Sequence, residues 1–156
     1  MMAMGIALVT GATSGIGEEF CWQLAAAHHD IVLVARREEK LRKLAEDLRQ
    51  IAGVKAEVIV ADLGVAGDVE RVAQRLSDEQ SPVGLLVNNA GFALGRSFID
   101  NTIEAEENAL DVMVRAPMVL SYAALNAMRA RGRGAIINVS SVASETGAGT
   151  YSAHKA

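Results

Sequence analysis

This sequence has one cysteine, no net positive charge and no long apolar run, and each of these absences excludes a class of protein. The single cysteine, Cys21, rules out a framework of internal disulfides and is typical of a reducing compartment. The net charge of −4 at pH 7 provides no cationic field for nucleic acid or an anionic membrane. No apolar run reaches the roughly 18 residues of a membrane span. We therefore expect no nucleic-acid partner and no membrane partner.

Signals for secretion and for metal binding are also lacking. The opening segment Met1–Leu8 has no basic residue, whereas a secretory signal peptide begins with a basic region. A cytoplasmic location is therefore the default expectation. The adjacent His28 and His29 have too few further ligands near them for a metal site, so no metal is expected.

The amino-acid composition is typical of an ordinary folded domain. Of the 156 residues, 51% are hydrophobic and 22% are charged, a balance that differs from that of a disordered chain. This length is typical of a single domain, over residues 1–156, with enough chain to form a real core.

Short apolar runs alternate with helical patterns along the chain. The runs are apolar on both sides, and each is followed by apolar residues at helical spacing, which indicates a parallel sheet covered on both faces. Right-handed crossovers then make this a doubly wound α/β domain, the Rossmann fold. The five expected strands are Ile6–Val9, Ile31–Val34, Val58–Ala61, Val83–Val87 and Ala135–Val139.

The helices are expected from apolar residues that recur every three or four positions. One long helix contains Pro117, which should kink it at a cost of about 3 kcal/mol. The four stripes are Ile16, Phe20, Leu24 and Ala27; Leu41, Leu44, Leu48 and Ile51; Val69, Val72 and Leu76; and, on the long helix, Leu110, Val114, Met118, Ser121 and Leu125.

A glycine-rich loop joins the first strand to the first helix. Its sequence over Thr10–Gly17 is T-G-A-T-S-G-I-G. Glycine lets backbone amides approach an anion, and a helix N-terminus adds partial positive charge, so the pattern predicts a phosphate or pyrophosphate ligand. The alternative is a simple tight turn. A P-loop nucleotidase is not indicated, because no Gly-Lys-Ser/Thr follows.

Four motifs, taken in order, resemble those of the short-chain dehydrogenase/reductase family. The first is the loop Thr10–Gly17. N-N-A-G at Asn88–Gly91 ends the fourth expected strand, I-N-V-S-S at Ile137–Ser141 ends the fifth, and Y-S-A-H-K at Tyr151–Lys155 matches the family's Y-x-x-x-K. The resemblance covers the whole chain but only the front part of a family member.

Because family members continue past this lysine, we expect an incomplete domain whose C-terminal strands lie outside the sequence. The expected consequences are an exposed apolar edge at the fifth strand, weakened dinucleotide binding and little or no catalysis by the 156 residues alone. The resemblance also implies a homo-oligomer for a full-length form.

The residues after the second strand predict the choice of cofactor. NAD-binding folds usually place an Asp or Glu about 20 residues past the glycine loop, to bind the ribose hydroxyls. Here Arg36 and Arg37 stand at this place. A guanidinium can bind a 2′-phosphate that a carboxylate would repel, so NADP (NADPH) is expected in preference to NAD. The alternative is that both arginines begin a solvated helix.

The resemblance implies further cofactor contacts. It assigns Asp62 to the adenine amino group, with a helix cap as the alternative. Asn88 would lie along the adenosine or tie neighbouring strands together. The full set of expected cofactor residues is Gly11, Thr13, Ser14, Gly15, Ile16, Gly17, Arg36, Arg37, Asp62, Leu63, Asn89, Ala90, Gly91, Tyr151 and Lys155.

The resemblance implies that Ser141, Tyr151 and Lys155 are catalytic. Tyr151 and Lys155 are four residues apart, which places them on one face of a helix. A free tyrosine has a pKa near 10 and is a poor base at neutral pH, so the nearby ammonium would stabilise the phenolate. Tyr151 would then move the proton during hydride transfer at a carbonyl or alcohol carbon, and Ser141 would hydrogen-bond the substrate oxygen.

Two features depart from the family pattern. Ser141 and Tyr151 are only ten residues apart, a few fewer than usual, so Ser140 or Ser144 is an alternative serine. Met113 stands where many members carry an asparagine of a proton relay, and a thioether cannot donate a hydrogen bond. A non-catalytic dinucleotide-binding module is therefore a second hypothesis.

A third hypothesis is a methyltransferase that binds S-adenosylmethionine on a similar sheet. It requires an acidic residue after the second strand, and Ala35-Arg36 argues against it. For the substrate pocket, Phe92, Leu94 and Phe98 suggest only that the small-molecule partner is apolar.

Overall fold

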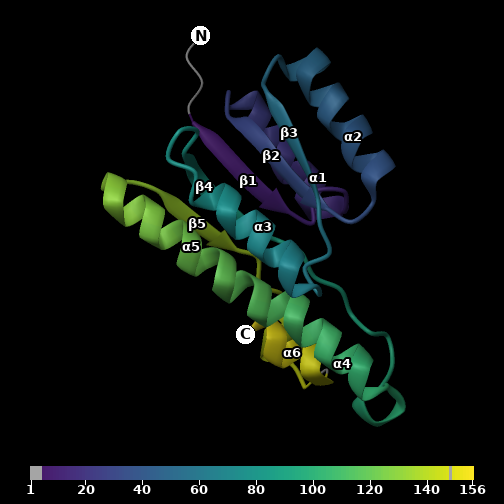
Figure 1. The fold of residues 1–156 in the computed structure, drawn as a ribbon. Coiled ribbons are helices and arrows are strands. Elements are labelled where there is room, and N and C mark those ends of the chain that lie inside the picture. The colour runs from purple at the N-terminus through teal and green to yellow at the C-terminus, as the bar shows by residue number, and fades with distance from the viewer. Residues whose placement is uncertain (1–4, 148) are drawn as a thin grey trace.

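Five parallel strands form a single sheet in the order β3-β2-β1-β4-β5 (Figure 1). The computed structural model describes residues 5–147 and 149–156. The strands are β1 (Ile6–Thr10), β2 (Asp30–Ala35), β3 (Ala56–Val60), β4 (Val83–Asn88) and β5 (Ala135–Asn138). All five expected strands are confirmed, with ends that differ by no more than two residues. The doubly wound α/β fold is therefore confirmed as well.

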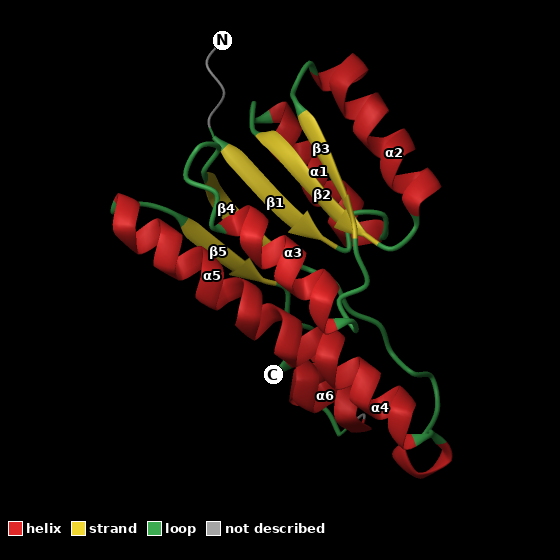
Figure 2. Ribbon diagram, in the orientation of Figure 1, coloured by secondary structure: helices red, strands yellow, loops and turns green. Residues whose placement is uncertain are grey.

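Helices cover both faces of the sheet and form two apolar cores (Figure 2). On one face, α1 and α2 pack on the β1 and β2 side chains that point toward them, such as Val9 and Leu33. On the other face, α3 and α5 pack on Leu8 and Val32. The helices are α1 (Gly15–Ala26), α2 (Glu38–Asp47), α3 (Ala66–Leu76), α4 (Ile103–Leu110), α5 (Ala116–Arg131) and α6 (Gly149–Lys155).

The sheet order reverses between β1 and β4, and this reversal positions the functional site. From β1 the chain builds outward to β2 and β3, and it then returns to β4 on the other side of β1. The crossover helices therefore diverge above the carboxyl ends of β1 and β4, which opens a crevice there.

The buried face of α1 differs from the expected stripe. Gly17, Cys21 and Ala25 face the sheet, whereas Ile16 is 62% exposed and Ala27 is also exposed. Small residues let the helix lie close to β1, so the large apolar residues of this segment are displaced toward its margin. In the same way, Leu41, Leu44 and Leu48 of the second stripe are buried, but Ile51 is exposed.

The long helical segment buries the side opposite to the expected stripe. Leu110, Val114, Met118 and Leu125 are exposed and Ser121 is half-buried. Apolar residues recur at helical spacing on both sides of this segment, so periodicity alone could not identify the side that packs on the sheet. The side that does so consists of Ala109, Val112, Met113, Ala116, Leu120, Ala124 and Met128.

The helical segment around Pro117 changes its hydrogen-bond pattern just before the proline, and the expected kink stays a prediction. α4 ends at Leu110, residues Asp111–Arg115 form a π-helical turn, and α5 begins at Ala116. Proline has no amide hydrogen and cannot donate to the carbonyl group of Met113, four residues earlier. The change of hydrogen-bond register therefore precedes the proline, and α5 continues regularly to Arg131.

Some apolar surface remains uncovered. β5 is the last strand of the sheet on its side, and its Ile137 is 38% exposed. The outer side of α4 and α5 adds Val114, Met118 and Leu125. In the part of the chain that the structure describes, no helix combines the length and the apolar character needed to cross a membrane.

Two substitutions on α5 test which side of the helix is buried. Leu120→Ala should lower the free energy of unfolding by about 2–5 kcal/mol, because it leaves a cavity between α5 and the sheet. Met118→Ala, at a side chain that is 63% exposed, should change it by less than about 0.5 kcal/mol. Urea denaturation followed by Trp22 fluorescence measures both. Equal losses would show that the assignment of faces is wrong.

Candidate functional site

Thr10, at the end of β1, ties the carboxyl ends of β1 and β4 together. It is almost fully buried, and its Oγ1 accepts hydrogen bonds from the amides of Asn89 and Ala90, each at 3.0 Å. The same hydroxyl donates to the carbonyl of Val87 at 3.4 Å. Sequence reasoning missed this role. The only signal was a hydroxyl residue at the end of an otherwise apolar strand.

The side chain of Asn89 holds the glycine loop in place. Its Nδ2 donates to the carbonyl oxygens of Thr10 at 3.1 Å and Gly11 at 3.3 Å. The amide nitrogen of this predicted cofactor residue is therefore directed at the loop.

Two glycines of the loop are required by packing, and a third is not. Gly11 has φ +63°, and a Cβ atom on it would lie 2.9 Å from Nδ2 of Asn89. A Cβ on Gly17 would overlap the carbonyl oxygen of Gly11, because α1 crosses the loop here at very close range. A Cβ on Gly15 would point into open space. Gly15 therefore leaves room at the surface of the site rather than inside the protein.

The first turn of α1 presents backbone amides that no side chain caps. Ser14 is the N-cap residue, but its Oγ donates to the Gly11 carbonyl at 2.9 Å and makes no cap hydrogen bond. The first helical bond runs from the amide of Glu18 to the carbonyl of Ser14. The amides of Gly15, Ile16 and Gly17 precede it, and such amides bind anions readily.

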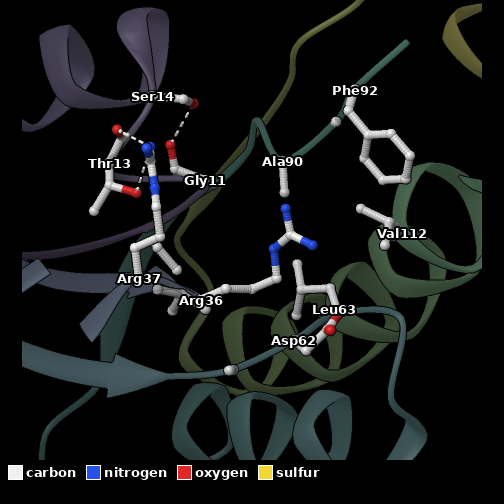
Figure 3. A pocket seen from close by; sticks show the side chains of 14 residues that line it. Gly11, Thr13, Ser14, Arg36, Arg37, Asp62, Leu63, Ala90, Phe92 and Val112 are labelled. Atoms are coloured by element: carbon white, nitrogen blue, oxygen red, sulfur yellow. Dashed lines mark hydrogen bonds between the residues drawn. The ribbon is translucent and has the colours of Figure 1, made fainter. Parts of the chain in front are cut away.

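A crevice of about 260 Å³ lies over the carboxyl ends of β1 to β4 (Figure 3). Its walls come from the glycine loop, from the turns after β2 and β3, and from the segment after β4. The expected cofactor residues that it brings together are Gly11, Thr13, Ser14, Arg36, Arg37, Asp62, Leu63, Ala90 and Gly91.

The two arginines after β2 have different surroundings. Nη2 of Arg37 donates to the carbonyl of Thr13 at 2.8 Å and approaches the Thr13 hydroxyl at 3.4 Å, so it braces the glycine loop. Arg36 instead extends across the crevice, with its guanidinium between Ala90 and Leu63 (Figure 3). Arg36 is therefore the arginine placed to meet a ligand.

Asp62 and Asn88 both have structural contacts. Oδ1 of Asp62 accepts from the amide of Gly64 at 2.9 Å. The N-cap of α3 is Val65, so Asp62 does not cap that helix. Nδ2 of Asn88 donates to Oδ1 of Asn138 at 2.9 Å and to the Ser121 hydroxyl at 3.1 Å. Of the two roles considered for Asn88, the structure thus displays the tie between neighbouring strands.

Tyr151 and Lys155 lie on α6, at the end of β5. Tyr151 is half-buried and lines a second cavity of about 620 Å³. Nζ of Lys155 donates to the carbonyl of Val139 at 3.1 Å, and burial lowers the pKa of this ammonium group below its ordinary value. A Cβ on Gly91 would lie 2.9 Å from this Nζ, so the lysine occupies space that the glycine leaves free. The second cavity also has the expected apolar wall of Phe92, Leu94 and Phe98.

Ser141 is placed differently from the other two expected catalytic residues. It is the N-cap of the short 3₁₀ turn Val142–Glu145, and its Oγ accepts from the amide of Ala143 at 3.2 Å. Within the described walls of the cavities beside α6, Ser141 is absent, whereas Ser140 lines a third cavity together with Lys155. The structure therefore brings Tyr151 and Lys155 onto one helix but leaves Ser141 off these walls.

Met113 and His154 line both cavities beside α6. Met113 is 7% exposed and belongs to the apolar core between the sheet and α5. The Nδ1 atom of His154 is buried and has no hydrogen-bond partner within residues 5–147 and 149–156. Sequence reasoning assigned no role to His154.

Comparison with known proteins places this geometry in context. Residues 5–156 match the family described as short chain dehydrogenase. L-xylulose reductase of Mus musculus is 43% identical over 140 residues, a match that covers 89% of this chain and 54% of that protein. Very-long-chain 3-oxoacyl-CoA reductase of Laccaria bicolor is 36% identical over 155 residues, covering 96% of this chain and 46% of that protein.

Solved structures show the same similarity. A short-chain dehydrogenase from Sphingobium yanoikuyae, in complex with NADPH, superposes with a TM-score of 0.94 at 36% identity. The superposition covers 97% of this chain and 60% of that one. The chain thus spans about half the length of these relatives.

Two alanine substitutions separate packing from ligand contact in the glycine loop. Gly17→Ala should lower the free energy of unfolding by about 1–3 kcal/mol, because the added methyl group forces α1 away from the loop. Gly15→Ala, at the start of the same helix, should leave it unchanged or raise it by up to about 1 kcal/mol. If an anion sits on the first turn, Gly15→Ala should nevertheless weaken binding. Thermal unfolding with and without NADPH measures both effects. If Gly15→Ala lowers the free energy of unfolding, the conclusion that a side chain at Gly15 would point into open space is wrong.

Proposed function

Because this chain belongs to the short-chain dehydrogenase family, we propose that it binds NADP(H) for hydride transfer between the nicotinamide and a carbonyl or alcohol substrate. The observation that carries this proposal is the crevice over β1 to β4. Ser14, the N-cap residue of α1, lines this crevice and leaves the amides of the first turn without a side-chain cap, and the Arg36 guanidinium extends across the crevice. Residues 1–156 are accordingly proposed to belong to one dinucleotide-binding domain.

The residues present fit a dinucleotide. The first turn of α1 offers donors to the diphosphate, and Gly15 leaves room for it because its missing side chain would point into open space. Asp62, Leu63, Ala90 and Gly91 all line the crevice, and Asp62 and Leu63 are proposed to contact the adenosine. The complex of the Sphingobium yanoikuyae relative with NADPH supports the same ligand class.

The preference for NADP(H) over NAD(H) rests on the end of β2. Ala35 and Arg36 occupy the place where a carboxylate would bind the ribose hydroxyls, and a guanidinium pairs well with a phosphate. Arg37 is engaged with Thr13, so Arg36 is the residue proposed to bind the 2′-phosphate. Arg37 contributes by keeping the loop in position.

The bound nicotinamide would supply or accept the hydride, and the proton chemistry is proposed for the protein. Tyr151 transfers the proton to or from the substrate oxygen. Lys155 follows four residues later on the same helix, fixed by the carbonyl of Val139, and its ammonium stabilises the phenolate of Tyr151. The Oγ of Ser141 accepts a hydrogen bond from the amide of Ala143, and its hydroxyl is proposed to donate a hydrogen bond to the substrate oxygen without transferring its proton.

A second candidate function is a dinucleotide-binding module without catalysis. Two observations favour it. Met113, at the position where the family resemblance implies the asparagine of a proton relay, provides no hydrogen-bond donor, and Ser141 lies off the described walls of the cavities beside α6. Both candidates share the cofactor site, so they differ only in whether Tyr151 transfers protons.

The chain spans about half the length of its relatives, so its substrate and its partners are proposals. We propose a small, largely apolar carbonyl or alcohol substrate, on the basis of Phe92, Leu94 and Phe98 in the second cavity. The exposed apolar side chains Val114, Met118 and Leu125 support a homo-oligomer that forms through the outer side of α4 and α5. The single cysteine supports a cytoplasmic location.

Replacing the two arginines separately tests the proposed cofactor preference. Arg36→Ser should weaken NADPH binding about tenfold or more, because a charge-assisted phosphate contact is lost, and leave NADH binding unchanged. Arg37→Ser should weaken both cofactors by a similar factor, because it loosens the shared loop. Isothermal titration calorimetry gives the four dissociation constants. Equal weakening of both cofactors by Arg36→Ser would contradict recognition of the 2′-phosphate.

Tyr151→Phe distinguishes an enzyme from a binding module. If Tyr151 transfers protons, turnover of carbonyl substrates with NADPH, followed at 340 nm, should fall at least about 100-fold. The dissociation constant for NADPH should change little. Turnover that survives the substitution contradicts the catalytic role. A wild-type protein that binds NADPH but turns over no carbonyl compound supports the binding module.

A further inference from the structure

Helix α6 carries both Tyr151 and Lys155, and little of its own structure fixes its place. It has only seven residues, and helices this short are marginal without tertiary contacts. Gly147 lies shortly before the helix, and its first residue, Gly149, adopts the left-handed conformation with φ +68°. Glycine gives the backbone wide freedom at these points. The position of α6 must therefore come from contacts with other elements.

The C-terminal end of α6 is held by the end of β5. Nζ of Lys155 donates to the carbonyl of Val139, and the hydroxyl of Ser140 donates to the carbonyl of Lys155. Both contacts lie at the last residue of the helix. They leave the first turn, which carries Tyr151, to be positioned by something else.

The first turn of α6 is attached to α4 through a buried carboxylate. Oγ1 of Thr150 donates to Oε2 of Glu106 at 2.6 Å, across 44 residues of sequence. The other oxygen, Oε1, accepts from Nδ2 of Asn101 at 2.8 Å. Glu106 is 7% exposed and is the one charged residue among the buried residues that the structure describes.

The buried carboxylate of Glu106 is held in place by two hydrogen bonds. Burying a charged group is costly unless hydrogen bonds satisfy it, and the two oxygens of Glu106 have one donor each. These bonds lower the pKa of Glu106, so it is ionised at neutral pH. Asn101 fixes the carboxylate from the segment before α4, which leaves Oε2 directed at Thr150.

We propose that Glu106 is a positioning residue that sets where Tyr151 stands by holding the first turn of α6 against α4. Glu106, Thr150 and Tyr151 all line the cavity of about 620 Å³, so the anchor stands beside the tyrosine it positions. This inference rests on the proposed role of Tyr151 only for its catalytic consequence. The attachment itself is independent of that role.

Hydrogen–deuterium exchange of the 156-residue protein tests the attachment directly. Thr150→Val keeps the branched shape of the side chain but removes the hydroxyl, and it should speed exchange of the α6 amides about tenfold. Thr150→Ser retains the hydroxyl and should restore slow exchange. Glu106→Leu should act like Thr150→Val, and the double variant should add nothing further, because both remove the same bond.

Matched controls separate positioning from general stability. Glu107→Leu changes the exposed neighbour on α4 and should leave exchange of α6 unchanged. Exchange of the β1 and β4 amides should stay at wild-type rates in Thr150→Val. Unchanged exchange of α6 in Thr150→Val overturns the inference. Exchange that rises equally across the sheet also overturns it, because that would indicate a loss of overall stability.

Kinetics test the catalytic consequence. Thr150→Val should lower kcat about tenfold with KM for NADPH unchanged, and Thr150→Ser should restore kcat. If α6 loosens while kcat is unaffected, the positioning role is wrong. If the wild-type protein shows no turnover while α6 loosens as expected, the anchor by Glu106 stands and the catalytic proposal fails for these 156 residues alone.

Discussion

The hydrogen bonds of Thr10 and Asn89 between the ends of β1 and β4 are the constraint on which the rest of the site depends. The Thr10 hydroxyl accepts hydrogen bonds from two backbone amides at the end of β4. The side-chain amide of Asn89 donates two hydrogen bonds to backbone carbonyls at the end of β1. Together they fix the carbonyl of Gly11, against which Gly17 of α1 packs. The direction of the first turn of α1, and hence of its amides, follows from these contacts.

Two motifs that are far apart in the sequence, N-N-A-G and Y-S-A-H-K, come into contact because one of them ends in a glycine. Gly91, in the segment after β4, lies where the amine of Lys155 approaches from α6. Because Gly91 has no side chain, the amine of Lys155 on α6 can lie against the segment that follows β4. The residues proposed to bind the cofactor and those proposed to be catalytic therefore meet at Gly91, and a side chain there would collide with the amine of Lys155.

Sequence patterns predicted the sheet well because strands buried on both faces carry an unambiguous apolar signal. They also indicated which loops meet at the crevice, since the glycine loop and the turns after β2, β3 and β4 follow strand ends, and parallel strand ends share one edge. They failed on α5, where both sides carry apolar residues and only packing on the sheet selects Leu120 over Met118. They also missed Glu106, because its partner Thr150 is 44 residues away and neither lies in a motif.

The claim that the first turn of α1 binds a diphosphate has a direct test. In ¹H–¹⁵N spectra of the labelled protein, NADPH should shift the backbone amides of Gly15, Ile16 and Gly17 more than those elsewhere in the chain. Adenosine, which has no phosphate, should leave these three amides in place even at saturation. Shifts confined to other surfaces, or equal shifts with adenosine, would contradict the account.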